Sequence, residues 1–173
     1  MVVTKGKHIM ATVSEKLVAL INKQITAEFE SAYLYLGMSQ YYEEQGFAGL
    51  AAWFFKQASE ENEHAVKFIN YLNQEEKKVI LEDIHAPKEV YSDLREPLVS
   101  QLQHEELVTS LIYGLVEQAE KDKDYRSLSF LKWYVDEQTE EEEHSRLLIQ
   151  QYDMLKGDVG ALLKWDHELG ERK

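Results

Sequence analysis

Apolar residues recur every three or four positions along four long stretches of the chain, a spacing that places them on one face of an α-helix. The first stretch covers residues 13–42, and Thr12 with Glu15 resembles a capping box at its start. Gly46 separates it from the second stretch, residues 47–74. The two stripes contain Leu17, Ile21, Gln24, Ile25, Glu28, Ala32, Tyr35 and Met38, then Leu50, Phe54, Ala58, Glu61, His64, Ala65, Phe68 and Leu72.

Two more stretches of the same kind follow, over residues 93–121 and 125–155. Pro97 fits the first turn of the earlier one, where backbone N–H groups have no partner inside the helix. Asp124 can cap the later one, and Asp158, after Gly157, can cap a short fifth helix ending near Gly170. The stripes contain Leu98, Leu102, Glu105, Val108, Ile112, Leu115 and Ala119, then Leu131, Tyr134, Gln138, Glu141, Ser145, Leu148 and Tyr152.

The segment between the second and third stretches, residues 75–92, lacks helical periodicity and contains Pro87. A helix of about 28 residues spans about 42 Å, and an extended segment of about 18 residues can cover that distance. The segment can therefore return along the whole length of the helices. The prediction is an all-α, four-helix bundle with one long crossover and a short fifth helix. Residues 12–173 form one domain, and residues 1–11 are a native or cloning-derived extension.

Composition narrows the possible functions. Asp and Glu number 32 against 19 Lys and Arg, for a net charge of −13, which argues against a nucleic-acid or anionic-membrane surface. The absence of cysteine excludes disulfides, thiolate catalysis and thiolate-ligated metals. No apolar run approaches the roughly 18 residues that span a bilayer. No signal peptide is visible, so the expected location is the cytoplasm.

Carboxylates interrupt all four apolar stripes, where an unpaired charge would be costly. Glu61 and His64 are three residues apart and share one helix face. A second spacing recurs in the two halves of the chain: 33 residues separate Glu28 from Glu61, and 33 residues also separate Glu105 from Gln138. Within the second half, Glu141 then corresponds to His64. A competing register, Glu141 with His144, is also a Glu-x-x-His pair and lies one helical turn later.

Such a set of side chains suits two divalent irons. Carboxylates can bridge two ions, and an imidazole is tolerated by iron. Glu28, Glu61, Glu105 and Glu141 would supply oxygens, while Gln138 offers a neutral oxygen or hydrogen bonds. Tyr35, two turns after Glu28, could hydrogen-bond the site or donate an electron.

Four segments resemble those of prokaryotic non-haem ferritins: Glu28-Phe-Glu-Ser-Ala-Tyr-Leu-Tyr35, Glu60-Glu-Asn-Glu-His64, His104-Glu-Glu-Leu-Val-Thr109 and Phe130 to Glu141. The resemblance covers residues 12–170. It implies a ferritin-like bundle that oxidises Fe2+ with O2, or hydrogen peroxide, and stores ferric mineral in a shell of 24 subunits. One iron would be held by Glu28, Glu61 and His64. The second would share Glu61 and use Glu105, with Gln138 and Glu141 nearby. A third, inward-lying site would use Glu60, Glu137 and Glu140.

Other functions remain to be weighed against this one. A bacterioferritin would carry a symmetric Glu-x-x-His pair and a haem-binding methionine where this chain has Asn62, so no haem is expected. A rubrerythrin-like peroxidase needs four cysteines, and a DNA-binding mini-ferritin lacks the fifth helix. A non-catalytic bundle would leave four core carboxylates unpaired, at a cost of several kcal/mol each.

Overall fold

Five α-helices make up most of the chain in the computed structural model, which describes residues 13–88 and 90–171. Thr12 and the predicted extension over residues 1–11 lie outside the described residues. The helices are α1 (Glu15–Glu44), α2 (Ala48–Gln74), α3 (Glu96–Asp122), α4 (Tyr125–Met154) and α5 (Val159–Gly170). The described residues contain no strand, which confirms the predicted all-α class.

Short polar side chains determine where several helices begin. Asp124 and Asp158 cap α4 and α5 as predicted, each accepting a backbone N–H three residues later at 3.0 Å. For α1 the expected capping box is wrong, because Ser14 is the N-cap and accepts from the Leu17 N–H at 3.2 Å. Helix α3 begins three residues later than predicted. Asp93 accepts the N–H groups of Arg95 and Glu96, both at 2.9 Å, and this turn precedes the first helical residue.

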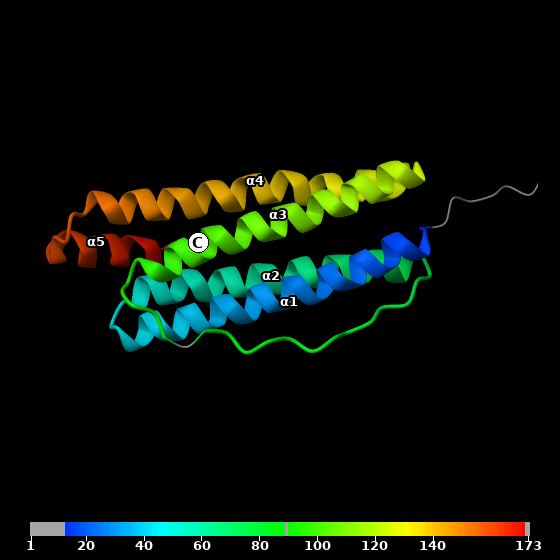
Figure 1. The fold of residues 1–173 in the computed structure, drawn as a ribbon. Helices are drawn as coiled ribbons and strands as arrows, with labels where there is room; N and C mark the ends of the chain where they lie inside the picture. The colour runs from blue at the N-terminus through cyan, green and yellow to red at the C-terminus, as the bar shows by residue number, and fades with distance from the viewer. Residues whose placement is uncertain (1–12, 89, 172–173) are drawn as a thin grey trace, which may run out of the picture.

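The helices form two hairpins, α1 with α2 and α3 with α4, packed side by side with α1 against α3. The crossover between Gln74 and Glu96 runs along α1 from one end of the bundle to the other (Figure 1). Asn22 fixes this crossover to α1, since its amide donates to the Lys78 carbonyl at 3.1 Å and accepts from the Ile80 N–H at 2.7 Å. The long return predicted from segment length is confirmed.

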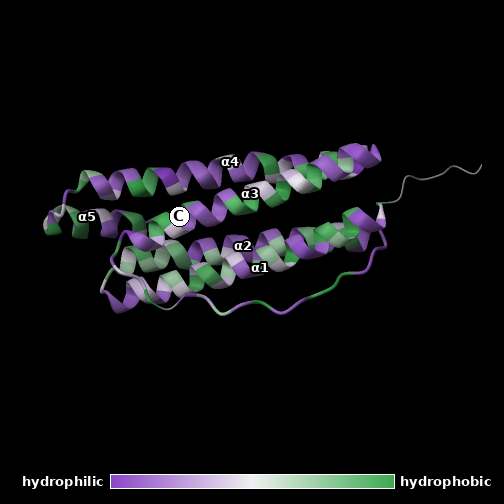
Figure 2. Ribbon diagram, in the orientation of Figure 1, coloured by the Kyte–Doolittle hydropathy of each residue, from purple (hydrophilic) through white to green (hydrophobic). Residues whose placement is uncertain are grey.

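Hydrophobic and hydrophilic residues alternate around each helix, as Figure 2 shows. One expected stripe position is wrong: Leu102 is only partly buried, whereas Gln101 is fully buried on the inner face of α3. No helix of the described residues is long and apolar enough to cross a membrane. Helix α5 packs against α2 and covers one end of the bundle (Figure 1).

Candidate metal centre

A polar layer divides the interior of the bundle into two hydrophobic clusters. One cluster contains Ile25 of α1 and Tyr134 of α4, and the other contains Tyr35 of α1 and Leu148 of α4. Each of the four long helices contributes buried polar residues at the height between the clusters. These residues are Glu28 on α1, Glu61 and His64 on α2, Glu105 on α3, and Gln138 and Glu141 on α4. The structure thus brings together residues that the sequence singled out in four separate segments.

Glu28, Glu61 and His64 form the tightest group in this layer. Each offers one ligand atom, and the three atoms lie within 4.8 Å of one another. His64 Nδ1 is 3.3 Å from Glu61 Oε2 and 4.0 Å from Glu28 Oε2. Glu28 Oε2 is buried and has no hydrogen-bond partner among the described residues. A buried carboxylate oxygen without a donor is costly, and a bound cation would remove that cost.

Burial also changes the acidity of these carboxyl groups. It raises the pKa of Glu28 well above its usual range, and the nearby charge of Glu61 adds to the increase. Burial raises the pKa of Glu61 in the same way, together with the charge of Glu105. Without a cation, several carboxylates in one dry layer repel one another and favour their neutral forms. A divalent cation would reverse this preference, because it stabilises the ionised carboxylates.

Glu105 is held by two neighbouring side chains. The Tyr35 hydroxyl of α1 donates a hydrogen bond to Glu105 Oε1, and Gln138 Nε2 of α4 donates to Glu105 Oε2 at 3.1 Å. Both bonds lower the pKa of Glu105, although burial has the larger effect and the net shift is upward. Tyr35 itself is fully buried, and desolvation raises the pKa of its phenol well above the usual value. Tyr35 therefore faces the centre as a neutral donor.

Glu141 lies on the same layer and is held from a different helix. Gln57 Nε2 of α2 donates to Glu141 Oε2 at 2.9 Å. Burial raises the pKa of Glu141 to about 8, with the charge of Glu105 as the next cause. In the alternative register, Glu141 would take the place of Gln138, and His144 would take the place of Glu141. His144 is exposed, whereas Gln138 and Glu141 are both buried, so the geometry favours the 33-residue repeat.

The three residues assigned to an inward-lying third site are more accessible. Glu60 and Glu137 are half-buried and Glu140 is exposed. Glu137 Oε1 lies 3.8 Å from His64 Nε2, on the opposite side of the imidazole from Glu61. Within the described residues, the compact group of possible ligands is limited to Glu28, Glu61 and His64, so the third site is not preassembled to the same degree.

Sequence reasoning missed several residues around the centre. His104 Nε2 and the Ser31 hydroxyl share a hydrogen bond of 2.7 Å, and the His104 ring packs edge-on against the Tyr35 ring. Desolvation lowers the pKa of His104. Its position beside Glu105 was visible in the sequence, but no spacing pattern distinguished it. Gln57 lies one turn before Glu61 and fits the same helical spacing, but the stripe used for α2 passed through Ala58, so Gln57 was not singled out.

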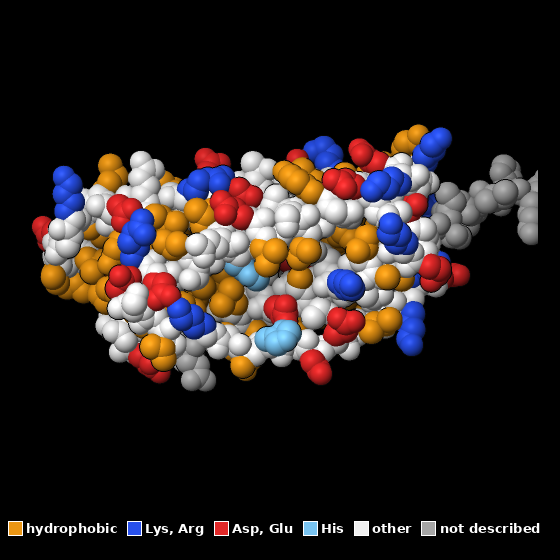
Figure 3. All heavy atoms as spheres, in the orientation of Figure 1, with side chains coloured by type: hydrophobic (Ala, Val, Ile, Leu, Met, Phe, Trp, Pro, Cys, Tyr) orange, Lys and Arg blue, Asp and Glu red, His pale blue; other side chains and the backbone are white. Residues whose placement is uncertain are grey.

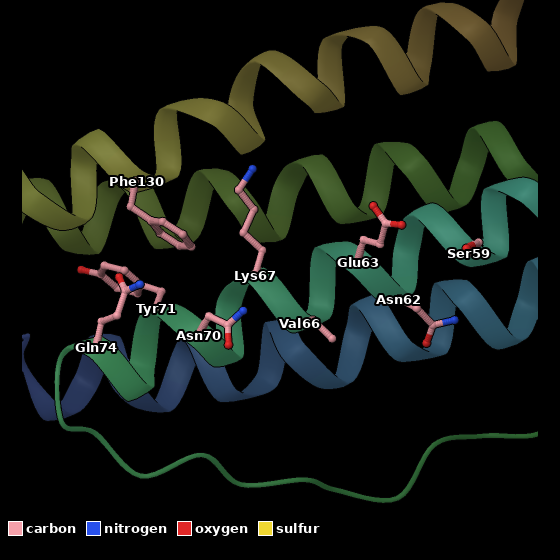
Figure 4. A pocket seen from close by; sticks show the side chains of 9 residues that line it. All are labelled: Ser59, Asn62, Glu63, Val66, Lys67, Asn70, Tyr71, Gln74 and Phe130. Carbon is pink, nitrogen blue, oxygen red and sulfur yellow. The ribbon is translucent and has the colours of Figure 1, made fainter. Parts of the chain in front are cut away.

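A surface pocket of about 440 Å³ lies along α2 beside α4, lined by Asn62, Lys67, Asn70, Tyr71, Phe130 and four further residues (Figure 4). Lys67 Nζ lies 3.0 Å from the centre of a Trp133 ring. None of the carboxylates of the polar layer lines this pocket. Elsewhere, acidic and basic side chains are interspersed with exposed hydrophobic ones over the face drawn in Figure 3. The metal centre is therefore separate from the pocket along α2.

Comparison with known proteins agrees with this geometry. Residues 18–155 match the ferritin family, described as a Ferritin-like domain. The chain is 38% identical over 157 residues to a probable bacterial non-heme ferritin-like protein of Haemophilus influenzae, covering 91% of this chain and 95% of the relative. It is 35% identical to a bacterial non-heme ferritin of Staphylococcus epidermidis, covering 92% and 96%. A solved open pore ferritin of Archaeoglobus fulgidus superposes with a TM-score of 0.93 at 36% identity, covering 95% and 100%.

Proposed function

We propose, because the chain belongs to the ferritin family, that it stores iron and oxidises Fe2+ at a di-iron centre inside its own helical bundle. The observation that carries this proposal is the buried group of Glu28, Glu61 and His64, whose ligand atoms lie within 4.8 Å of one another. Two carboxylates and one imidazole form a donor set that suits Fe2+. The expected location is the cytoplasm.

The two iron ions would share Glu61. Glu28 and His64 would complete the protein ligands of the first ion. Glu105, held by Tyr35 and Gln138, would bind the second ion, with Glu141 as a further carboxylate. Glu60, Glu137 and Glu140 would receive a third ion on the more accessible side of His64.

The proposed oxidation of Fe2+ requires electrons, protons and a site shielded from water, and the side chains of the layer bear on each. Two Fe2+ ions each lose one electron, and O2 takes both electrons with two protons to give H2O2. Binding of the cations ionises carboxyl groups whose pKa is raised in the iron-free protein, so protons become available inside the layer. The hydrophobic clusters above and below exclude water, which strengthens the electrostatic hold on the ions. Tyr35 holds Glu105 in place through its hydroxyl.

The storage function requires assembly, and we expect a homo-oligomeric shell of 24 subunits. Support comes from exposed apolar side chains on α1, α2 and the crossover, where Tyr33, Phe55 and Ile84 line one pocket. Monomeric proteins rarely expose large contiguous apolar patches. Light scattering coupled to size exclusion tests this, with Phe55→Arg expected to produce smaller species and Phe55→Leu, which keeps the side chain apolar, as the control. A wild-type chain that remains monomeric would contradict the proposal.

Aerobic oxidation of Fe2+, followed by the absorbance of ferric-oxo species, tests the catalytic function. We expect fast oxidation by the wild type and a loss of at least about 100-fold in the double variant Glu61→Ala, His64→Ala. Glu63→Gln changes an exposed carboxylate next to the same residues and should retain the wild-type rate. Equal, slow oxidation by the wild type and the double variant, with helicity intact, would exclude a ferroxidase centre at this layer.

A further inference from the structure

Three of the four buried carboxylates in the layer share a feature: each accepts a hydrogen bond from the carboxamide of a glutamine. The bonds measure 2.9 Å to Glu28, 3.1 Å to Glu105 and 2.9 Å to Glu141. The donors are Gln24, Gln138 and Gln57, respectively. Gln138 belongs to the expected centre, whereas Gln24 and Gln57 have no function assigned so far.

Gln24 and Gln57 approach the layer from different directions. Gln24 lies on α1, one turn before Glu28, and the bond runs along the helix. Gln57 lies on α2, one turn before Glu61, and reaches across to Glu141 on α4. Both side chains are almost completely buried. Each bond therefore forms in a dry environment, where hydrogen bonds restrict a side chain strongly.

In each pair the amide donates to one identified carboxylate oxygen. In Glu28, Gln24 donates to Oε1, and Oε2 has no hydrogen-bond partner among the described residues. The free Oε2 is the atom that lies 4.0 Å from His64 Nδ1. The amide thus determines which oxygen faces the metal position. In Glu141 the oxygen engaged by Gln57 is Oε2.

A neutral donor suits this task. A lysine or arginine at the same place would neutralise the carboxylate and repel an incoming cation. A carboxamide restricts the rotamer while leaving the negative charge available. Partners of this kind, one layer beyond the metal ligands, commonly change metal affinity by about 10–100-fold.

We propose that Gln24 and Gln57 are positioning residues that each fix one carboxylate oxygen, so that Gln24 prepares the first metal position and Gln57 the second. This inference rests on the proposed di-iron function. It predicts a separation of effects between the two positions, because each glutamine contacts a different carboxylate on a different helix.

The test uses Co2+ as the probe, because it requires no oxidation. The full-length protein without iron is titrated by calorimetry and by visible absorption, which reports the coordination of Co2+. The variants are Gln24→Met and Gln57→Met, since methionine has a similar length and no donor. Gln101→Met is the matched control. Gln101 is also completely buried, but its amide has no hydrogen-bond partner among the described residues.

We expect Gln24→Met to weaken the first Co2+ position by about 10–100-fold and Gln57→Met to weaken the second to the same degree. The other position in each variant should keep its affinity and absorption spectrum, which also shows that the bundle is folded. Gln101→Met should leave both positions unchanged. Unchanged affinities in both variants, or equal weakening of both positions by each variant, would overturn the inference. Two normal Co2+ positions without Fe2+ oxidation by the wild type would instead refute the ferroxidase proposal.

Discussion

Asp166 of α5 caps the first turn of α2 through Leu50, whose backbone N–H donates to Asp166 Oδ1 at 2.7 Å. The Gly49 N–H donates to the other carboxylate oxygen at 3.1 Å. The N-cap residue of α2, Phe47, has no side chain that could serve these groups. The short fifth helix therefore supplies a cap that α2 lacks, and it joins the end of the chain to the helix that carries Glu61.

Replacing Asp166 by alanine is expected to reduce the free energy of unfolding by about 1–3 kcal/mol, because two buried N–H groups lose their acceptor. Asp166→Asn keeps one acceptor oxygen and should lose less. Urea unfolding of the iron-free protein measures the difference. His167→Ala, at an exposed neighbouring position, should have little effect. Equal stability of Asp166→Ala and the wild type would show that α5 does not support α2.

Gly49→Ala should be more disruptive than the loss of the cap itself. A Cβ atom at Gly49 would lie 1.6 Å from the backbone oxygen of Asp166, so α5 must move away. Gly114→Ala is the matched control, because a Cβ there meets nothing within 4 Å in the chain. In the middle of α3 that change should stabilise the helix by about 0.5–1 kcal/mol. Thermal unfolding of the two variants should therefore shift in opposite directions.

Tyr35→Phe removes the hydroxyl that donates to Glu105 while preserving the ring. We expect Fe2+ oxidation to slow by about tenfold or more, since a partner of a metal ligand is lost. Stopped-flow absorbance at saturating Fe2+ measures the rate. Tyr42→Phe removes the hydroxyl of another fully buried tyrosine, which donates to the Leu94 carbonyl, and it should keep the rate. Similar rates for all three proteins would exclude a catalytic contribution of Tyr35.

Stability of the iron-free protein should decrease as the pH rises from about 4.5 to about 8. Burial raises the pKa of Glu141 from 4.5 to about 8 in the folded protein. Within this window the folded state binds more protons than the unfolded state, so unfolding becomes more favourable as protons are removed. Urea midpoints at several pH values measure the slope. Glu141→Gln should flatten it, and a wild-type stability that rises through this window would contradict the assignment.

Glu137 and Glu140 should control a third iron ion without affecting the first two. Glu137→Gln with Glu140→Gln is expected to remove one Fe2+ per subunit from an anaerobic titration, since these carboxylates lie on the accessible side of His64. The tightest two positions should retain their affinity. Glu143→Gln, on an exposed position of the same helix, serves as the control. Loss of all three ions in the double variant would argue against a separate third site.

The fold was predictable because its main determinants are local. Helical periodicity, the caps Asp124 and Asp158, and the length of the crossover together specify a bundle with parallel α2 and α3. The 33-residue spacing also matched the pair Glu28 and Glu61 of the first hairpin with the pair Glu105 and Gln138 of the second. Equal spacing in two similar hairpins places these residues at the same height along the bundle. The sequence by itself therefore determined the architecture and the polar layer.

Only the tertiary structure decided which groups face one another across helices. Gln57 and Glu141 are 84 residues apart, and Asp166 reaches Leu50 over 116 residues. Periodicity assigns a residue to a face of its own helix, but the rotation and height of neighbouring helices determine its contacts. Gln101 illustrates this, because it occupies the buried position of α3 that periodicity had assigned to Leu102. Packing against α1 and α4, rather than hydrophobicity along one helix, selected which side of α3 is inside.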